Sequence, residues 1–413
     1  MKRAYYVAVH RDEHILQKSS SGGMFTIFAE YILLLGGVIC GAVFDVDTQM
    51  VRHVFTDSME GVDRMRKSKY VWSKFADVVQ QIGVYLESGR PVLFSGTPCQ
   101  AASVQARYSE YDNLYILDLF CRGVSRGEIF SDYIRRQKKN VRNIDFRYGP
   151  KEDSNYIIKY TYGDGSTEKH NWSEDAYATS YVWSLNIRQA CMDCIYTKRH
   201  MSDWTVGDWD DKKWAAAHGL MAKHPSILVV NSNKGKRVLE AMKDRMYLFP
   251  IRDEGMVAAY YQLHQQGHGA WAYDRHLARV FLNSYREKGF YAAFYEVLYP
   301  NIYQRITDAN HHYAGENVFI YGAGYWGQIC CAMITRCFPH WKITGYVVTK
   351  KGDRRKEPEY VIVALDELTD DDREKAWFVI AVKDETAQSI IYQTLMCCGV
   401  KKKQIIQAVL REG

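Results

Sequence analysis

The chain has 413 residues, of which 47% are hydrophobic and 25% are charged. This length is typical of two or three domains, and the composition excludes disordered, collagen-like and coiled-coil proteins. The net charge of +6, from 54 basic and 48 acidic residues, is too small for this length to predict nucleic-acid binding. The residues after Met1 lack the apolar core of a signal peptide, so we expect a cytoplasmic protein.

Short apolar runs alternate with helical patterns over the first 146 residues, which predicts an α/β layer. The apolar stretch 25–44 is interrupted by Glu30 and by Gly36 and Gly37, so we expect a helix, a turn and a buried strand there. An integral membrane protein is therefore not expected. The predicted strands are residues 5–9, 37–44, 91–94 and 114–120, and the predicted helices are residues 23–35, 73–86 and 128–138.

The pattern changes after the α/β layer. Residues 146–169 alternate with period two around a Gly-Asp-Gly turn, which predicts an antiparallel hairpin and thus an α+β insertion. A strand at residues 226–231 is followed by largely helical sequence to about Tyr303. The polar segment 307–316 is predicted to be a linker that divides a domain of residues 1–306 from one of residues 317–413.

The last 97 residues restart with a strand, a glycine turn and a helix, which predicts a small doubly wound, Rossmann-like domain. Gly322, Gly324 and Gly327 form the turn and are candidates for binding a nucleotide or a nucleotide sugar. The acidic residue typical of NAD sites is absent, and residues 349–351 read Thr-Lys-Lys, which favours an extra phosphate over a ribose diol. A structural or partner-docking module is the alternative.

Four of the ten cysteines could converge on a metal site. Cys191 and Cys194 form a C-x-x-C pair, while Cys99 and Cys121 each follow a predicted strand, and parallel strands end at the same edge of a sheet. Four thiolates fit a 4Fe-4S cluster or zinc; alternatively, Cys99 and Cys121 are buried small side chains. The other six are predicted to lie in the core: Cys40, Cys330, Cys331, Cys337, Cys397 and Cys398.

Two polar segments could bind a phosphate. Residues 19–23 read Ser-Ser-Ser-Gly-Gly and precede a helix, where hydroxyls and open backbone can hold an anion; the alternative is an N-cap with a flexible turn. Residues 66–70 place cations and an aromatic side chain before the next helix, although a solvated charged face is the usual explanation of such a run.

These motifs, in this order, resemble the β-subunit family of coenzyme F-420 hydrogenases and dehydrogenases over about residues 5–290. The resemblance implies a flavoprotein that holds FAD beside an iron–sulfur cluster and passes electrons between a one-electron carrier and a hydride carrier. Relatives include proteins encoded among polysaccharide-biosynthesis enzymes. The motifs occupy residues 20–25, 36–38, 68–70, 92–100, 146–147, 191–194 and 202–208.

The resemblance also implies site residues and partners. The cluster ligands would be Cys99, Cys121, Cys191 and Cys194. The residues lining the flavin nucleotide would be Ser20, Ser21, Gly22, Gly23, Ser68, Lys69 and Tyr70, with Thr97 of the 92–100 motif. No cysteine precedes Cys40, so a separate ferredoxin or a deazaflavin is the expected electron carrier. Arg122 stands where the family usually has His, and residues 209–211 depart from its Phe-Trp-Gly.

The sequence therefore predicts an FAD- and 4Fe-4S-dependent oxidoreductase. It would move electrons between ferredoxin or a deazaflavin and a small, sugar-like substrate of cell-surface polysaccharide biosynthesis. The alternative is a non-catalytic zinc or iron–sulfur scaffold that docks a polysaccharide-modifying enzyme through residues 317–413.

Overall fold

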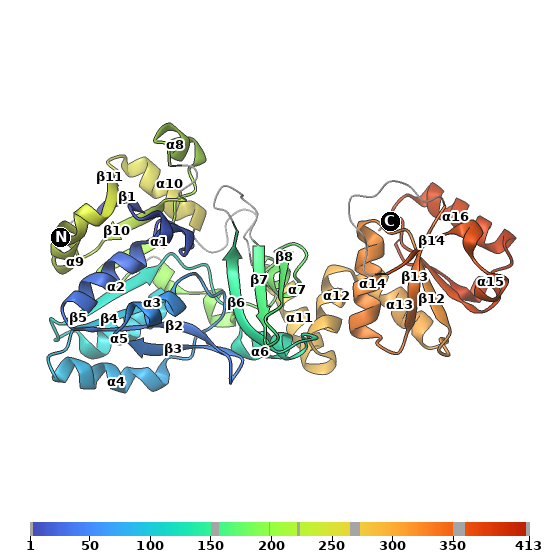
Figure 1. Ribbon diagram of the computed structural model, residues 1–413, viewed down its shortest axis with the longest axis horizontal. Helices are drawn as coiled ribbons and strands as arrows, with labels where there is room; N and C mark the ends of the chain where they lie inside the picture. The colour runs from blue at the N-terminus through green and yellow to red at the C-terminus, as the bar shows by residue number, and fades with distance from the viewer. Residues whose placement is uncertain are drawn as a thin grey trace. The chain divides into compact units, whose positions relative to one another are not determined.

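The computed structural model describes residues 3–149, 157–197, 199–220, 224–264, 273–349 and 360–409. The chain divides into two compact units, Met1–Ala278 and Arg279–Gly413, which are described separately (Figure 1).

The first unit is built on an eight-stranded sheet with the order β11-β1-β10-β9-β5-β4-β2-β3. Strands β9, β5, β4 and β2 are parallel to their neighbours in this series, whereas β10 pairs antiparallel with β9, and β3 with β2. The predicted α/β layer is therefore confirmed. The strands are β1 (Ala4–His10), β2 (Val38–Asp45), β3 (Met50–Thr56), β4 (Val92–Gly96), β5 (Leu114–Leu119), β9 (Trp204–Asp208), β10 (Ser226–Val230) and β11 (Met246–Pro250).

Helices connect these strands, and α2 and α4 fall where the sequence predicts them. Helix α5 is not among the helices that the sequence predicts. The helices are α1 (Glu13–Gln17), α2 (Met24–Leu34), α3 (Met59–Met65), α4 (Ala76–Glu87), α5 (Pro98–Tyr108), α8 (Lys212–Ala217), α9 (Asn233–Met242) and α10 (Glu254–His264). Among the described residues, no helix has the length and apolar character needed to cross a membrane.

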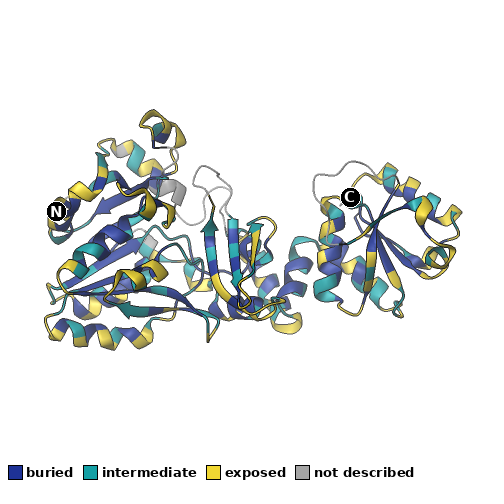
Figure 2. Cartoon of the chain, viewed as in Figure 1, coloured by how far each residue is buried: buried dark blue, intermediate teal, exposed yellow. Residues whose placement is uncertain are grey.

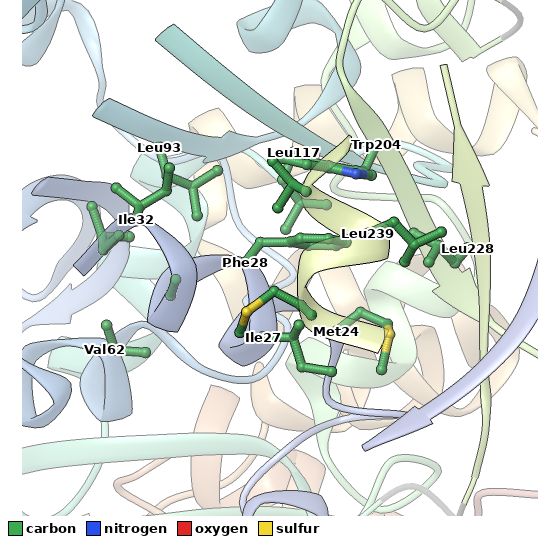
Figure 3. Packing of buried hydrophobic residues seen from close by; sticks show 14 of the residues in the cluster. Met24, Ile27, Phe28, Ile32, Val62, Leu93, Leu117, Trp204, Leu228 and Leu239 are labelled. Carbon is green, nitrogen blue, oxygen red and sulfur yellow. The ribbon is translucent and has the colours of Figure 1, made fainter. Parts of the chain in front are cut away.

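Both faces of the sheet are covered, and Figure 2 shows its central strands as mostly buried. Helix α2 packs on one face, where the ring of Phe28 stacks on Trp204 with a centroid distance of 4.1 Å (Figure 3). Leu93 faces this cluster and its neighbour Phe94 faces the opposite one, as the two-residue period of a strand requires. This double burial explains the continuous apolar runs that mark these strands in the sequence.

The predicted insertion is a three-stranded antiparallel sheet with the order β6-β7-β8. The Gly-Asp-Gly turn joins β7 to β8, so the predicted hairpin is confirmed. Its core includes Phe130, Phe146, Tyr160 and Tyr177. The elements are α6 (Gly127–Arg135), β6 (Val141–Tyr148), β7 (Ile157–Tyr162), β8 (Thr167–Asn171), α7 (Ala176–Val182), and the 3-10 turns η1 (Gln189–Cys191) and η2 (Ile195–Thr197).

The second unit holds a five-stranded sheet in which every pairing is parallel, with the order β14-β13-β12-β15-β16. The first strand, β12, lies at the centre, as in a doubly wound sheet. The elements are α12 (Phe290–Leu298), α13 (Pro300–Asn310), β12 (Asn317–Tyr321), α14 (Tyr325–Cys337), β13 (Lys342–Val348), β14 (Ile362–Ala364), α15 (Asp370–Lys375), β15 (Trp377–Ile380), α16 (Glu385–Cys397) and β16 (Ile405–Gln407), while α11 (Arg275–Lys288) crosses the division between the units.

Two sequence-based predictions differ from the structure of this unit. The segment 307–316 begins inside α13, whose last residue is Asn310 and whose Ile306 is buried. Cys330 and Cys331 are buried as predicted, but Cys397 is exposed. The core prediction is wrong at Cys397 because Ile391 and Leu395 form the buried face of α16.

Candidate functional site

A pocket lies at the carboxyl ends of β4 and β5, beside the N-terminus of α2. Its lining includes Ser95, Gly96 and Thr97 at the end of β4 and Leu119 at the end of β5. Open α/β sheets bind their ligands at this edge. Of the predicted flavin residues, Ser20, Ser21, Gly23, Ser68, Lys69 and Thr97 line the pocket.

The Ser-Ser-Ser-Gly-Gly segment shapes one wall. The Oγ of Ser20 accepts a hydrogen bond from the Ser68 backbone N–H at 3.0 Å, so the two predicted phosphate segments touch. Gly23 has a φ of 82° and precedes α2, and no side chain caps this helix. The first backbone N–H groups of α2, with the positive end of its dipole, are thus available to an anion.

Gly22 has a different role from the one predicted. It is not part of the pocket lining, and its N–H donates to the Ser226 Oγ at 2.9 Å. A Cβ at this position would lie 2.3 Å from the carbonyl oxygen of Ala8. Gly22 is therefore required for close packing against β1 and β10.

Three cationic side chains line another wall of the pocket, and each forms hydrogen bonds or an ion pair with other groups of the protein. Arg66 donates from Nε to the Thr26 Oγ1 at 3.0 Å, and Lys67 pairs with Asp145. The Lys69 ammonium donates to the carbonyl oxygens of Arg64, Met65, Arg66 and Lys67 at distances of 3.2, 2.9, 2.7 and 3.3 Å. Burial lowers the pKa of Lys69 to about 7. Lys69 thus contacts the C-terminal end of α3 while lining the pocket.

Tyr70 is not among the lining residues. Its ring packs against Trp172 and Tyr181, with centroid distances of 4.8 and 5.1 Å. Arg147 forms a hydrogen bond with the Tyr70 side chain and an ion pair with Asp208. Residues of three separate sequence motifs therefore meet in one cluster.

His53 is a pocket residue that the sequence analysis missed. Its Nε2 lies 3.0 Å from the Ser95 carbonyl oxygen and its Nδ1 lies 2.8 Å from the Ser73 Oγ. Burial lowers the pKa of His53 to about 4, so the ring is neutral at pH 7 and donates from Nε2 to the carbonyl. No motif marks it, because a single inward-facing histidine on an edge strand has no sequence signature.

The four predicted cluster cysteines share one neighbourhood next to this pocket. Cys99 lies in the first turn of α5, and the Thr97 Oγ1 is 3.2 Å from its Sγ. Burial raises the pKa of Cys121, and negative charge on Cys191, Cys99 and Cys194 raises it further. Each of these three thiols is therefore near enough to Cys121 to affect its titration. Strand β5 and the η1 turn bring them there.

Backbone groups form hydrogen bonds with two of the thiols. Gly123 forms a backbone hydrogen bond to Cys121, and Val124 forms one to Cys191; both bonds act to lower the thiol pKa against the larger effect of burial. Hydrogen bonds of this kind accompany sulfur ligands of iron–sulfur clusters.

Tyr273 adds an unpaired polar atom to this neighbourhood. Its hydroxyl is buried and has no hydrogen-bond partner in the described part of the chain. Burial raises its pKa, and charge on Cys121, Cys191 and Cys194 contributes to the same shift. A Cβ built on Gly123 would lie 3.1 Å from this hydroxyl and 3.2 Å from the Cys191 Cβ. A buried hydroxyl without an acceptor in this neighbourhood fits a bound group that has sulfur acceptors of its own.

The C-x-x-C loop is held by α11. Arg275 donates to both carboxylate oxygens of Asp193 at 2.6 and 3.1 Å and to the Met192 carbonyl oxygen at 3.2 Å. Within the described ranges, no three or more His, Cys, Asp or Glu side chains are grouped as a metal ion would require.

The glycine turn of the second unit has a structural explanation at two of its three positions. Gly322 has a φ of 103°, and a Cβ on Gly327 would lie 1.9 Å from the Gly322 carbonyl oxygen. Gly324 begins α14, where no side chain provides a cap. The Thr349 Oγ1 lies 3.0 Å from the Tyr321 hydroxyl, whereas Lys350 and Lys351 lie outside the described residues.

Comparison with known proteins bears on part of this site. Residues 89–251 match the sequence model of a family described as the C terminus of the beta subunit of coenzyme F420 hydrogenase/dehydrogenase. The resemblance is confirmed over this segment. It contains Thr97 and the four cysteines, whereas the segments at residues 20–23 and 68–70 lie outside it.

Among solved structures, the chain is similar to one from the F420-reducing [NiFe] hydrogenase complex from Methanosarcina barkeri. The two are 14% identical, and the TM-score is 0.43 over 63% of this chain and 87% of that chain. No protein with a curated description matches the sequence.

Proposed function

We propose that the chain is an oxidoreductase that holds FAD in the pocket beside α2 and a 4Fe-4S cluster on Cys99, Cys121, Cys191 and Cys194. The observation that carries the proposal is the position of four neighbouring thiols directly beside the pocket, through the contact of Thr97 with Cys99. The family match over residues 89–251 supports it. When bound together, such groups convert single electrons into a hydride equivalent.

The chain's own groups fit each cofactor. The uncapped start of α2, the Ser20 and Ser68 segments and Lys69 would hold the flavin pyrophosphate. A four-iron cluster binds each cysteine through a different iron atom and spaces the sulfurs more widely than one tetrahedral zinc does. The family match over the segment that contains all four cysteines supports the cluster over zinc.

The finer assignments rest on the resemblance of the motifs. We propose ferredoxin or a deazaflavin as the electron carrier and a small, sugar-like substrate of cell-surface polysaccharide biosynthesis, in the cytoplasm. The second unit would recognise a nucleotide or nucleotide sugar through the open start of α14 at Gly324.

Iron content and absorption of anaerobically purified protein test the proposal. We expect visible bands of flavin and cluster in the wild type, and we expect Cys194→Ser to lose more than about half of the iron and sulfide because a cluster needs its fourth thiolate. Cys397→Ser is the matched control, since Cys397 is exposed in the other unit, and should keep the full iron content. Zinc without visible absorption, or full iron in all four single Cys→Ser variants at the proposed ligands, would contradict the assignment.

A further inference from the structure

A second cavity, of about 740 Å³, lies at the opposite edge of the large sheet. It is lined by residues beside the amino ends of the parallel strands β5 and β9, including Tyr115 and Asp203, and by the start of α9. None of the proposed flavin or cluster residues lines this cavity. It therefore needs an explanation of its own.

Two arginines give the cavity unneutralised positive charge. Arg3 precedes β1 and Arg237 lies one turn into α9, and in the described part of the chain neither guanidinium has an ion pair or a hydrogen bond. Two guanidiniums from separate segments that reach one cavity are a typical arrangement for binding a phosphate or carboxylate group.

The third basic side chain of the cavity, Lys234, is paired with the acidic side chain of Asp203. Lys234 lies 3.6 Å from Asp203 and over the Tyr115 ring at 4.9 Å. Asp203 also accepts hydrogen bonds from the Ile116 backbone N–H at 3.0 Å and from the Ser232 hydroxyl. Asp112 is the other acidic group in the lining, so the three basic side chains Arg3, Lys234 and Arg237 exceed the two acidic ones by one charge.

Helix α9 and Asn231 add polar groups to the lining of the cavity. The Ser232 Oγ accepts the Gly235 N–H at 2.8 Å and thus caps this ten-residue helix, while Ser232 and Lys234 line the cavity. The Asn231 Nδ2 donates to the Ser202 and Thr205 hydroxyls, while its Oδ1 is buried without a partner in the described chain.

We infer that this cavity binds the phosphate group of a small phosphate ester, with Arg3 and Arg237 on the phosphate. The site is separate from the proposed redox site and does not depend on it.

Isothermal titration of the full-length protein with glycerol 3-phosphate, at constant ionic strength, tests this inference. Removal of both guanidiniums in an Arg3→Gln, Arg237→Gln variant should weaken binding about tenfold or more, because charge-assisted bonds to phosphate are lost. Lys236→Gln is the matched control: Lys236 is exposed on the same helix but does not line the cavity, and its variant should bind within about twofold of the wild type.

Three outcomes would overturn the inference: no binding by the wild type at about ten millimolar ligand, unchanged binding by the double variant, or equal weakening by Lys236→Gln. Glycerol should compete only weakly, which separates phosphate recognition from polyol binding. Iron and flavin content of the double variant should equal that of the wild type. A failure here therefore leaves the proposed redox function untouched, and a failure of that function leaves this test intact.

Discussion

The Tyr273 hydroxyl is the side-chain donor best placed to tune a cluster on the four thiols. It is buried beside Cys191 without a partner in the described residues, and hydrogen bonds to cluster sulfurs stabilise the more negatively charged reduced state. Tyr273→Phe should keep the iron and lower the cluster midpoint potential by about 30–60 mV, which is about a three- to tenfold change in the reduction equilibrium.

Potentiometric titration followed by electron paramagnetic resonance measures this change. Tyr181→Phe is the control, since the Tyr181 hydroxyl donates to the Gly123 carbonyl oxygen at 3.0 Å in the same neighbourhood. That variant should shift the potential less. An unchanged potential in a fully loaded Tyr273→Phe protein would show that this hydroxyl does not reach a sulfur.

His53 makes stability depend on pH. Its folded-state pKa of about 4 lies below the ordinary value of 6.5 because of burial, so between these pH values the unfolded chain binds more protons than the folded chain. The free energy of unfolding should therefore rise with pH across this window, by about 3 kcal/mol from this group. Denaturant unfolding at pH 5 and pH 7 measures the slope. His53→Gln, whose amide can still donate to the Ser95 carbonyl oxygen, should flatten it, and an equal slope in both proteins would contradict the assignment.

At the scale of single elements, the sequence is most informative where strands end. The strands that precede Cys99 and Cys121 are mostly buried, so their apolar runs are clear in the sequence, and parallel pairing brings the two thiols to the same edge of the sheet. The same reasoning locates the Ser-Gly segment before α2. Strand ends and helix starts thus indicate where the thiols and the Ser-Gly segment lie, whereas Ser68, Lys69 and Thr97 are expected only from the family resemblance.

Elements with weak periodicity are the ones that the sequence does not reveal. Helix α5 buries Gln100, Ala101 and Val104, so its inner face has too little apolar character to stand out from a loop. Strand β3 is at the sheet edge and turns His53 inward, which removes one apolar position from its alternation. Gly22 shows a related limit: close backbone packing and ligand binding both demand glycine, and only the neighbouring backbone distinguishes them.

At the scale of the whole molecule, the second unit begins before the first strand of its sheet. The sequence predicts the second domain from its first strand at Asn317, because the glycine turn follows that strand. In the structure, α12 and α13 precede β12 and pack within the same unit: Arg336 of α14 lies over the Tyr291 ring at 4.8 Å, and Arg305 of α13 donates to the Gln407 carbonyl oxygen at 3.0 Å. The sequence of an amphipathic helix without a motif does not show which domain the helix packs against.

This packing predicts where the second unit can be separated. A fragment of residues 317–413 loses the contacts of Ile302, Tyr303 and Ile306, which are buried in the full chain. Burying one such side chain stabilises a domain by about 1.5–3 kcal/mol, so loss of α12 and α13 should cost several kcal/mol of a total near 5–15 kcal/mol. A fragment of residues 289–413 keeps both helices and should unfold cooperatively at a clearly higher urea concentration. Equal midpoints for the two fragments would show that the helices do not belong to the unit's folding core and would restore the boundary at residue 317.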